Sequence, residues 1–66
     1  MIKYDRFWAL LEASEETTYT LVNNHNISSH TLNRLKHGKA TTTDTLDKLC
    51  NILNCKIEDL VEHEPD

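Results

Sequence analysis

The chain has 66 residues, a formal net charge of -4, 38% hydrophobic residues, 27% charged residues, one glycine and one proline. This length suits one domain spanning residues 1–66, and so few turn-forming residues argue against an all-β fold. No apolar run approaches the ~18 residues that cross a bilayer, and the N-terminus lacks the continuous apolar segment of a secretion signal, so a cytoplasmic protein with no membrane contact is expected.

The first two predicted helices cover about residues 3–13 and residues 18–25. Thr17 precedes the second helix as its N-cap, because a threonine hydroxyl accepts a free backbone N–H. Asn26 follows it where the chain must turn sharply, and asparagine is the best non-glycine residue at positive φ. The apolar residues of the first helix recur at helical spacing, which predicts one inward stripe: Tyr4, Phe7, Trp8 and Leu11.

The third predicted helix, residues 29–37, has clear signals at both ends. Ser28 is a suitable N-cap, and Gly38, the only glycine, stands where a left-handed residue closes a helix. Leu32 and Leu35 are spaced to face inward. The connection between the second and third helices is about three residues long, which is the size of turn in a helix-turn-helix.

A fourth helix is expected from Thr42 or Thr43 to about Asn54, with an apolar stripe of Leu46, Leu49, Cys50 and Leu53. A short fifth helix over about residues 57–62 buries Leu60, and residues 63–66 form an acidic tail. The pattern therefore predicts an all-α fold of five short helices without a strand.

The sequence lacks the residue patterns of the common phosphate-binding and metal-binding sites. One glycine excludes a glycine-rich phosphate loop, and Cys50 and Cys55 do not form the paired spacing of a zinc site. His30 and His37 are seven residues apart, about 10.5 Å along a helix, so one ion cannot take both. We therefore expect no enzyme activity, no cofactor, no metal and no small-molecule ligand.

Positive charge concentrates on the third predicted helix. Residues 28–40 carry Arg34, Lys36 and Lys39 and no acid, whereas the segments on either side are net acidic. Two interpretations are open at this point. The face binds an anion, with the major groove of DNA as the best fit, or it is a solvated helix face without a function.

On the DNA interpretation, the outward residues divide into two sets of candidates. Hydrogen-bonding side chains early and midway along the helix suit base edges: Ser29, His30, Asn33 and Arg34. Cations, and groups near the helix starts, suit phosphates: Thr18, Ser28, Lys36, His37 and Lys39.

Residues 17–60 resemble the lambda-repressor-like (Cro-type, XRE) helix-turn-helix family, most clearly in "NISSHTLNRLKHGK" and "TLDKLCNILNCKIEDL". The resemblance implies a compact five-helix bundle that acts as a transcriptional regulator on double-stranded DNA, with residues 29–37 as its recognition helix. Three positions depart from the family pattern. Thr18 stands where many members have a phosphate-binding Gln, Asn26 replaces the usual turn Gly, and Val22 replaces a smaller Ala.

The acidity of the rest of the chain predicts weak DNA binding by a monomer, because phosphate contacts supply most non-specific affinity. A homodimer on two half-sites about one helical turn apart is expected to compensate. The alternative is a protein-interaction module of the same fold that modulates another regulator. Its acidic surface would comprise Asp44, Asp47, Glu58, Asp59, Glu62, Glu64 and Asp66.

Overall fold

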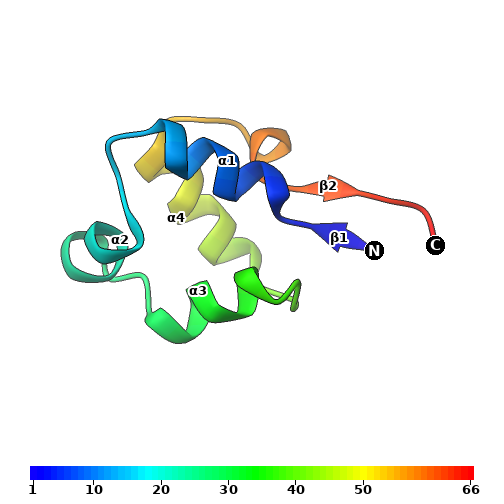
Figure 1. The fold of residues 1–66 in the computed structure, drawn as a ribbon, viewed down its shortest axis with the longest axis horizontal. Helices are drawn as coiled ribbons and strands as arrows, with labels where there is room; N and C mark the ends of the chain where they lie inside the picture. Colours follow the sequence, from blue (N-terminus) through cyan, green and yellow to red (C-terminus); the bar gives the residue numbers. More distant parts are fainter.

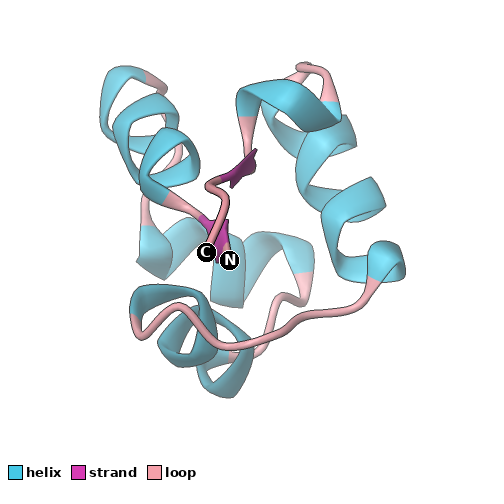
Figure 2. Cartoon of the chain, turned by 90° about the vertical axis from the view of Figure 1, so that its right-hand side faces the viewer, coloured by secondary structure: helices cyan, strands magenta, loops and turns pink.

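The computed structural model describes all 66 residues as four α-helices, one 3-10 turn and a two-stranded ribbon (Figure 1). The elements in chain order are β1 (Ile2–Lys3), α1 (Asp5–Ala13), α2 (Thr18–His25), α3 (Ser29–Lys36), α4 (Thr43–Leu53), η1 (Ile57–Asp59) and β2 (Glu62–His63). The four helices surround one core, and the chain ends lie side by side at the ribbon (Figures 1 and 2). None of the helices is long and apolar enough to cross a membrane.

Three of the four helices begin at a hydroxyl cap. The side chains of Thr17, Ser28 and Thr42 each accept a hydrogen bond from the backbone N–H three residues further on, at 3.2, 3.0 and 3.1 Å. In α2 the cap is reciprocal, because Thr20 Oγ1 accepts the Thr17 N–H at 2.8 Å. The predicted caps Thr17 and Ser28 are therefore confirmed, and together they fix where both helices of the helix-turn-helix begin.

Left-handed residues follow three of the four helices. Asn26 has φ 59° and closes α2, Gly38 has φ 68° just after α3, and Asn54 has φ 52° after α4. The predicted positive φ of Asn26 is confirmed. Because Asn26 reverses the chain within three residues, α3 starts immediately beside the end of α2.

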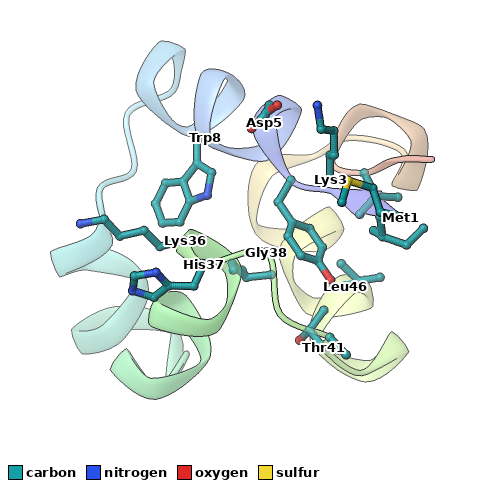
Figure 3. Close-up of a pocket in the computed structure, with 14 residues that line it drawn as sticks. Met1, Lys3, Asp5, Trp8, Lys36, His37, Gly38, Thr41 and Leu46 are labelled. Atoms are coloured by element: carbon teal, nitrogen blue, oxygen red, sulfur yellow. The ribbon is translucent and has the colours of Figure 1, made fainter. Parts of the chain in front are cut away.

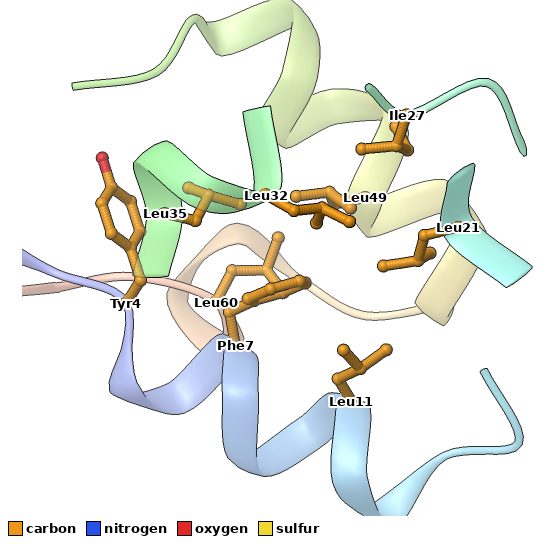
Figure 4. Close-up of a cluster of buried hydrophobic side chains, with 9 residues drawn as sticks. All are labelled: Tyr4, Phe7, Leu11, Leu21, Ile27, Leu32, Leu35, Leu49 and Leu60. Atoms are coloured by element: carbon orange, nitrogen blue, oxygen red, sulfur yellow. The ribbon is translucent and has the colours of Figure 1, made fainter. Parts of the chain in front are cut away.

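The core draws side chains from every helix (Figure 4). Leu32 and Leu35 are buried, as the spacing predicts, and they hold the inner face of α3 against the rest of the domain. Trp8 was expected inside the stripe of α1 but is only half-buried at the edge of the core. The nine buried residues are Tyr4, Phe7, Leu11, Leu21, Ile27, Leu32, Leu35, Leu49 and Leu60.

The prediction of no strand is wrong. β1 pairs antiparallel with β2, with Ile2 opposite His63 and Lys3 opposite Glu62. Strands of two residues are too short to show an alternating apolar pattern, and their partners lie at opposite ends of the sequence. As a result α1 begins at Asp5 rather than residue 3, and the expected acidic tail begins inside the ribbon.

The expected fifth helix is a single 3-10 turn, η1, of three residues. Leu60 follows it and is completely buried, which confirms its place in the core. Arg6 of α1 holds both sides of this turn, since its guanidinium donates to the Glu58 carbonyl at 2.9 Å and to the Glu62 carboxylate at 3.3 Å. The chain then extends into β2 instead of continuing as a helix.

Candidate nucleic-acid interface

The outer face of α3 is a continuous polar surface. Five residues at helical spacing are exposed on it: Ser29, His30, Asn33, Lys36 and His37. Their positions repeat at i, i+1, i+4, i+7 and i+8, which places them on one side of the helix, opposite the buried Leu32 and Leu35. This face combines hydrogen-bond donors, acceptors and one formal cation, without an acid. We name these five residues the α3 outer face.

Arg34 lies apart from the α3 outer face. It is half-buried, and its Nε donates to the Ala40 carbonyl at 3.0 Å, while its own carbonyl accepts the Lys39 N–H at 2.8 Å. Arg34 is one of the base-reading candidates, and that role stays a prediction. The structure places it at the flank of α3, where it also holds the loop that leads to α4.

Arg34→Ala is therefore expected to weaken the fold as well as remove a positive charge. Loss of the bond to the Ala40 carbonyl should lower the free energy of unfolding by about 0.5–1.5 kcal/mol. Thermal unfolding followed by circular dichroism measures this change. Lys39→Ala is the control, because the exposed Lys39 side chain makes no hydrogen bond or ion pair within the fold. Equal melting temperatures for the two variants would contradict the structural role of Arg34.

The phosphate candidates occupy two flanks of the α3 outer face. Thr18 is exposed at the first residue of α2, and Lys39 is exposed beyond the other end of α3. Ser28 is engaged in its own cap, since its Oγ accepts the Thr31 N–H at 3.0 Å and donates to Thr31 Oγ1 at 2.8 Å. Lys36 and His37 belong to the outer face itself.

A groove of about 870 Å³ runs between α1, α2 and α3. Trp8, Val22 and Leu32 supply its buried and half-buried lining. Its rim is polar. Thr18, Tyr19 and Asn23 of α2 form one side of the rim, and Ser29, Asn33 and Lys36 of the α3 outer face form the other. Tyr19 and Asn23 were not identified from the sequence. The sequence offered one signal for them, which is that the aromatic Tyr19 does not stand at an inward position of the second helix.

A second hollow, of about 760 Å³, lies between the N-terminal segment and the C-terminal end of α3 (Figure 3). Figure 3 shows the Trp8 indole above the side chains of Lys36 and His37. Trp8 and Lys36 line both hollows. Because Trp8 is the only tryptophan of the chain, its fluorescence reports on events at this side of α3.

The electrostatics of the fold sharpen the charge contrast seen in the sequence. Lys3 pairs with Glu64 at 2.8 Å and Arg6 with Glu62 at 3.3 Å, so the N-terminal cations are neutralised at the ribbon. The hydrogen bond from Lys3 to the Glu64 carboxylate, followed by the attraction between their charges, raises the pKa of Lys3. Five cations keep no acidic partner, and three of them are in or just after α3: Arg34, Lys36 and Lys39.

The acids of the interaction-module hypothesis are largely engaged within the fold. Glu62 and Glu64 pair with cations of the N-terminal segment, and Asp66 lies 3.1 Å from the N-terminal amine. Asp59 accepts the Lys56 backbone N–H at 3.0 Å. Asp44, Asp47 and Glu58 form no ion pair within the fold.

Cys50 and Cys55 are both free thiols. Burial, followed by the neighbouring Cys50, raises the pKa of Cys55 to about 11. Its thiol therefore stays protonated near neutral pH, and a protonated thiol is a poor nucleophile and a poor metal ligand. No three His, Cys, Asp or Glu side chains gather in an arrangement that can hold a metal ion.

Comparison with known proteins connects this geometry to a family and to a solved structure. The model of the Cro/C1-type HTH DNA-binding domain matches residues 2–66. The crystal structure of the transcriptional regulator VanUg (Form II) is similar, with a TM-score of 0.86 and 25% sequence identity over 98% of this chain and 87% of that chain. No curated protein matches the sequence.

Proposed function

The chain belongs to the Cro/C1-type helix-turn-helix DNA-binding family, and we propose that it is a transcriptional regulator that binds a specific double-stranded DNA sequence with α3 in the major groove. One observation supports this proposal most strongly. The α3 outer face is exposed, polar and free of acids, in a chain whose net charge is -4.

The roles of individual residues follow from their places on α3. Ser29 and His30 lie in its first turn, and Asn33 lies one turn further on, where an amide can pair with the N6 and N7 atoms of adenine. Base edges are therefore assigned to these three residues. Lys36 and Lys39, near and beyond the C-terminal end of α3, are assigned to one strand's phosphates.

The start of α2 is assigned to the other strand. Thr18 is exposed there, and the free backbone N–H groups of the first turn, with the helix dipole, favour a phosphate. Many family members have a Gln at the position of Thr18. The threonine side chain is shorter, so this phosphate contact depends more on the backbone N–H groups. The fold therefore offers phosphate contacts on both sides of the reading helix.

A homodimer completes the proposal. Three unpaired cations near α3 supply few phosphate contacts, and affinity for DNA rises steeply with their number. A second copy doubles the contacts and reads a second half-site about one helical turn away. Affinity for duplexes with one or two half-sites, measured with sedimentation of the complexes, distinguishes the monomer from the dimer.

Selection from a random duplex library at low salt tests the proposed function directly. A recurring sequence motif is expected for the parent protein, and a smeared or absent motif for Asn33→Ala. Failure of the correctly folded parent to enrich any motif would contradict sequence-specific binding. If a stoichiometric protein partner were then isolated without DNA, the protein-interaction alternative would replace it.

Lys36→Ala is expected to weaken binding to every duplex by a similar factor, because a phosphate contact does not depend on base sequence. The slope of log affinity against log salt should fall in magnitude by about 1. Titration of labelled duplex at several salt concentrations gives this slope. Lys48→Ala on α4 removes a cation that is also exposed and unpaired but lies on another helix, and it should leave the slope unchanged. Equal effects of the two substitutions would indicate only a change in net charge.

A further inference from the structure

We propose that Tyr19 of α2 is a further DNA-contacting residue, which docks its ring and hydroxyl on the sugar–phosphate backbone beside the major groove that α3 reads. This inference rests on the DNA-binding function proposed above, and it adds a contact from a second helix. In this proposal Tyr19 contributes to the affinity for DNA and to the position of the protein on the duplex, whereas the α3 outer face reads the base sequence.

The exposure of Tyr19 is the first observation. Four large hydrophobic side chains are exposed in this fold, and Tyr19 at 73% is the most exposed of them. The other tyrosine, Tyr4, is 6% exposed and belongs to the core. The Tyr19 hydroxyl makes no hydrogen bond within the fold, whereas an aromatic ring with a free polar tip is the kind of side chain that interfaces favour.

The position of Tyr19 is the second observation. It lines the groove between α1, α2 and α3, and shares that groove with Ser29, Asn33 and Lys36 of the α3 outer face. A duplex that places bases against Asn33 therefore brings its backbone over the first turn of α2, where Tyr19 follows the phosphate candidate Thr18. The only charged residue of the groove lining is Lys36, so nothing acidic there opposes a phosphate.

The backbone that carries Tyr19 is held in place before DNA arrives. Asn23 Nδ2 donates to the Tyr19 carbonyl at 2.9 Å, one turn further along α2. Thr17 and Thr20, on either side of Thr18 and Tyr19, form the reciprocal cap of the helix. Since only the two side-chain torsions of Tyr19 remain to be fixed, the contact costs little conformational entropy.

The chemistry of the contact predicts a distinct experimental signature. A tyrosine hydroxyl donates a hydrogen bond to a phosphate oxygen but carries no charge. Its loss should weaken binding to specific and non-specific duplexes by the same factor. No counterion is released by a neutral donor, so the salt dependence should not change, in contrast to Lys36→Ala.

The test uses the full chain and duplexes that contain the selected motif or a scrambled motif, with affinity measured by fluorescence anisotropy at several salt concentrations. Tyr19→Phe is expected to lower affinity for both duplexes by about tenfold, which is the loss of one hydrogen bond to a charged acceptor. Tyr19→Ala should weaken binding further, because the ring contact is also lost. Both variants should keep the parent's salt slope and melting temperature.

Ile57→Ala serves as the matched control, since it removes another exposed hydrophobic side chain from η1, at the opposite edge of the molecule from α3 in Figure 1. Unchanged affinity for Tyr19→Phe and Tyr19→Ala, together with loss of motif binding by Asn33→Ala, would overturn the role of Tyr19 and leave the proposed function standing. Failure of the folded parent to bind any duplex would overturn both.

Discussion

Phe7→Ala is expected to lower the free energy of unfolding by about 3–5 kcal/mol, the usual cost of removing a buried phenylalanine side chain. Phe7 is 1% exposed and belongs to the cluster of nine buried residues that forms the core. A domain of this size has a total stability of roughly 3–10 kcal/mol. The substitution should therefore unfold much of the protein, as urea denaturation followed by circular dichroism will show.

The control for this result is Ile57→Ala. Ile57 is a large apolar residue too, but it is 49% exposed in η1, and its substitution should change stability by no more than about 0.5 kcal/mol. The difference between the two variants measures burial rather than size. Similar denaturation midpoints would show that Phe7 is not at the centre of the core.

Asn33→Ala is expected to cost about 1–3 kcal/mol of specific DNA binding and to leave the fold unchanged. Asn33 is exposed on the α3 outer face, and its side chain makes no hydrogen bond within the protein, so its amide is free for a base edge. The loss should fall on one base pair of the site. Affinities for duplexes altered at that base pair should become equal to that for the original site.

Asn51→Ala is the matched control for Asn33→Ala, because it removes the same amide from an exposed position on α4. It should bind the selected duplex with the affinity of the parent protein. Loss of binding by both variants, or by neither, would contradict the assignment of base reading to Asn33. Unfolding curves for both proteins confirm that stability is not the cause.

Arg34 shows where reasoning from the sequence stopped. Its spacing put it with the outward residues of the third helix, among the candidates for base edges. The spacing does not show that the loop after α3 folds back, so that the Ala40 carbonyl lies within 3.0 Å of the guanidinium. Tyr19 shows the converse, since only the groove between α2 and α3 places it beside the outer face.

The sequence by itself determined that four helices form, the caps of α2 and α3, and the inner face of α3, because these depend on residues within a few positions of one another. Thr17, Asn26, Ser28 and Gly38 act through the local backbone, and their identities predict where α2 and α3 begin and end. The family resemblance and the absence of acids from residues 28–40 are also read directly from the local sequence.

The tertiary structure decided what depends on residues distant in the sequence. The β1–β2 ribbon joins Lys3 to Glu62, and two-residue strands carry no pattern that could predict their pairing. The same contact converts a tail of free acids into ion pairs and leaves the unpaired cations concentrated near α3. The sequence gives only the net charge of the chain. The electrostatic potential at a surface depends on which charged side chains are paired, and only the fold brings those pairs together.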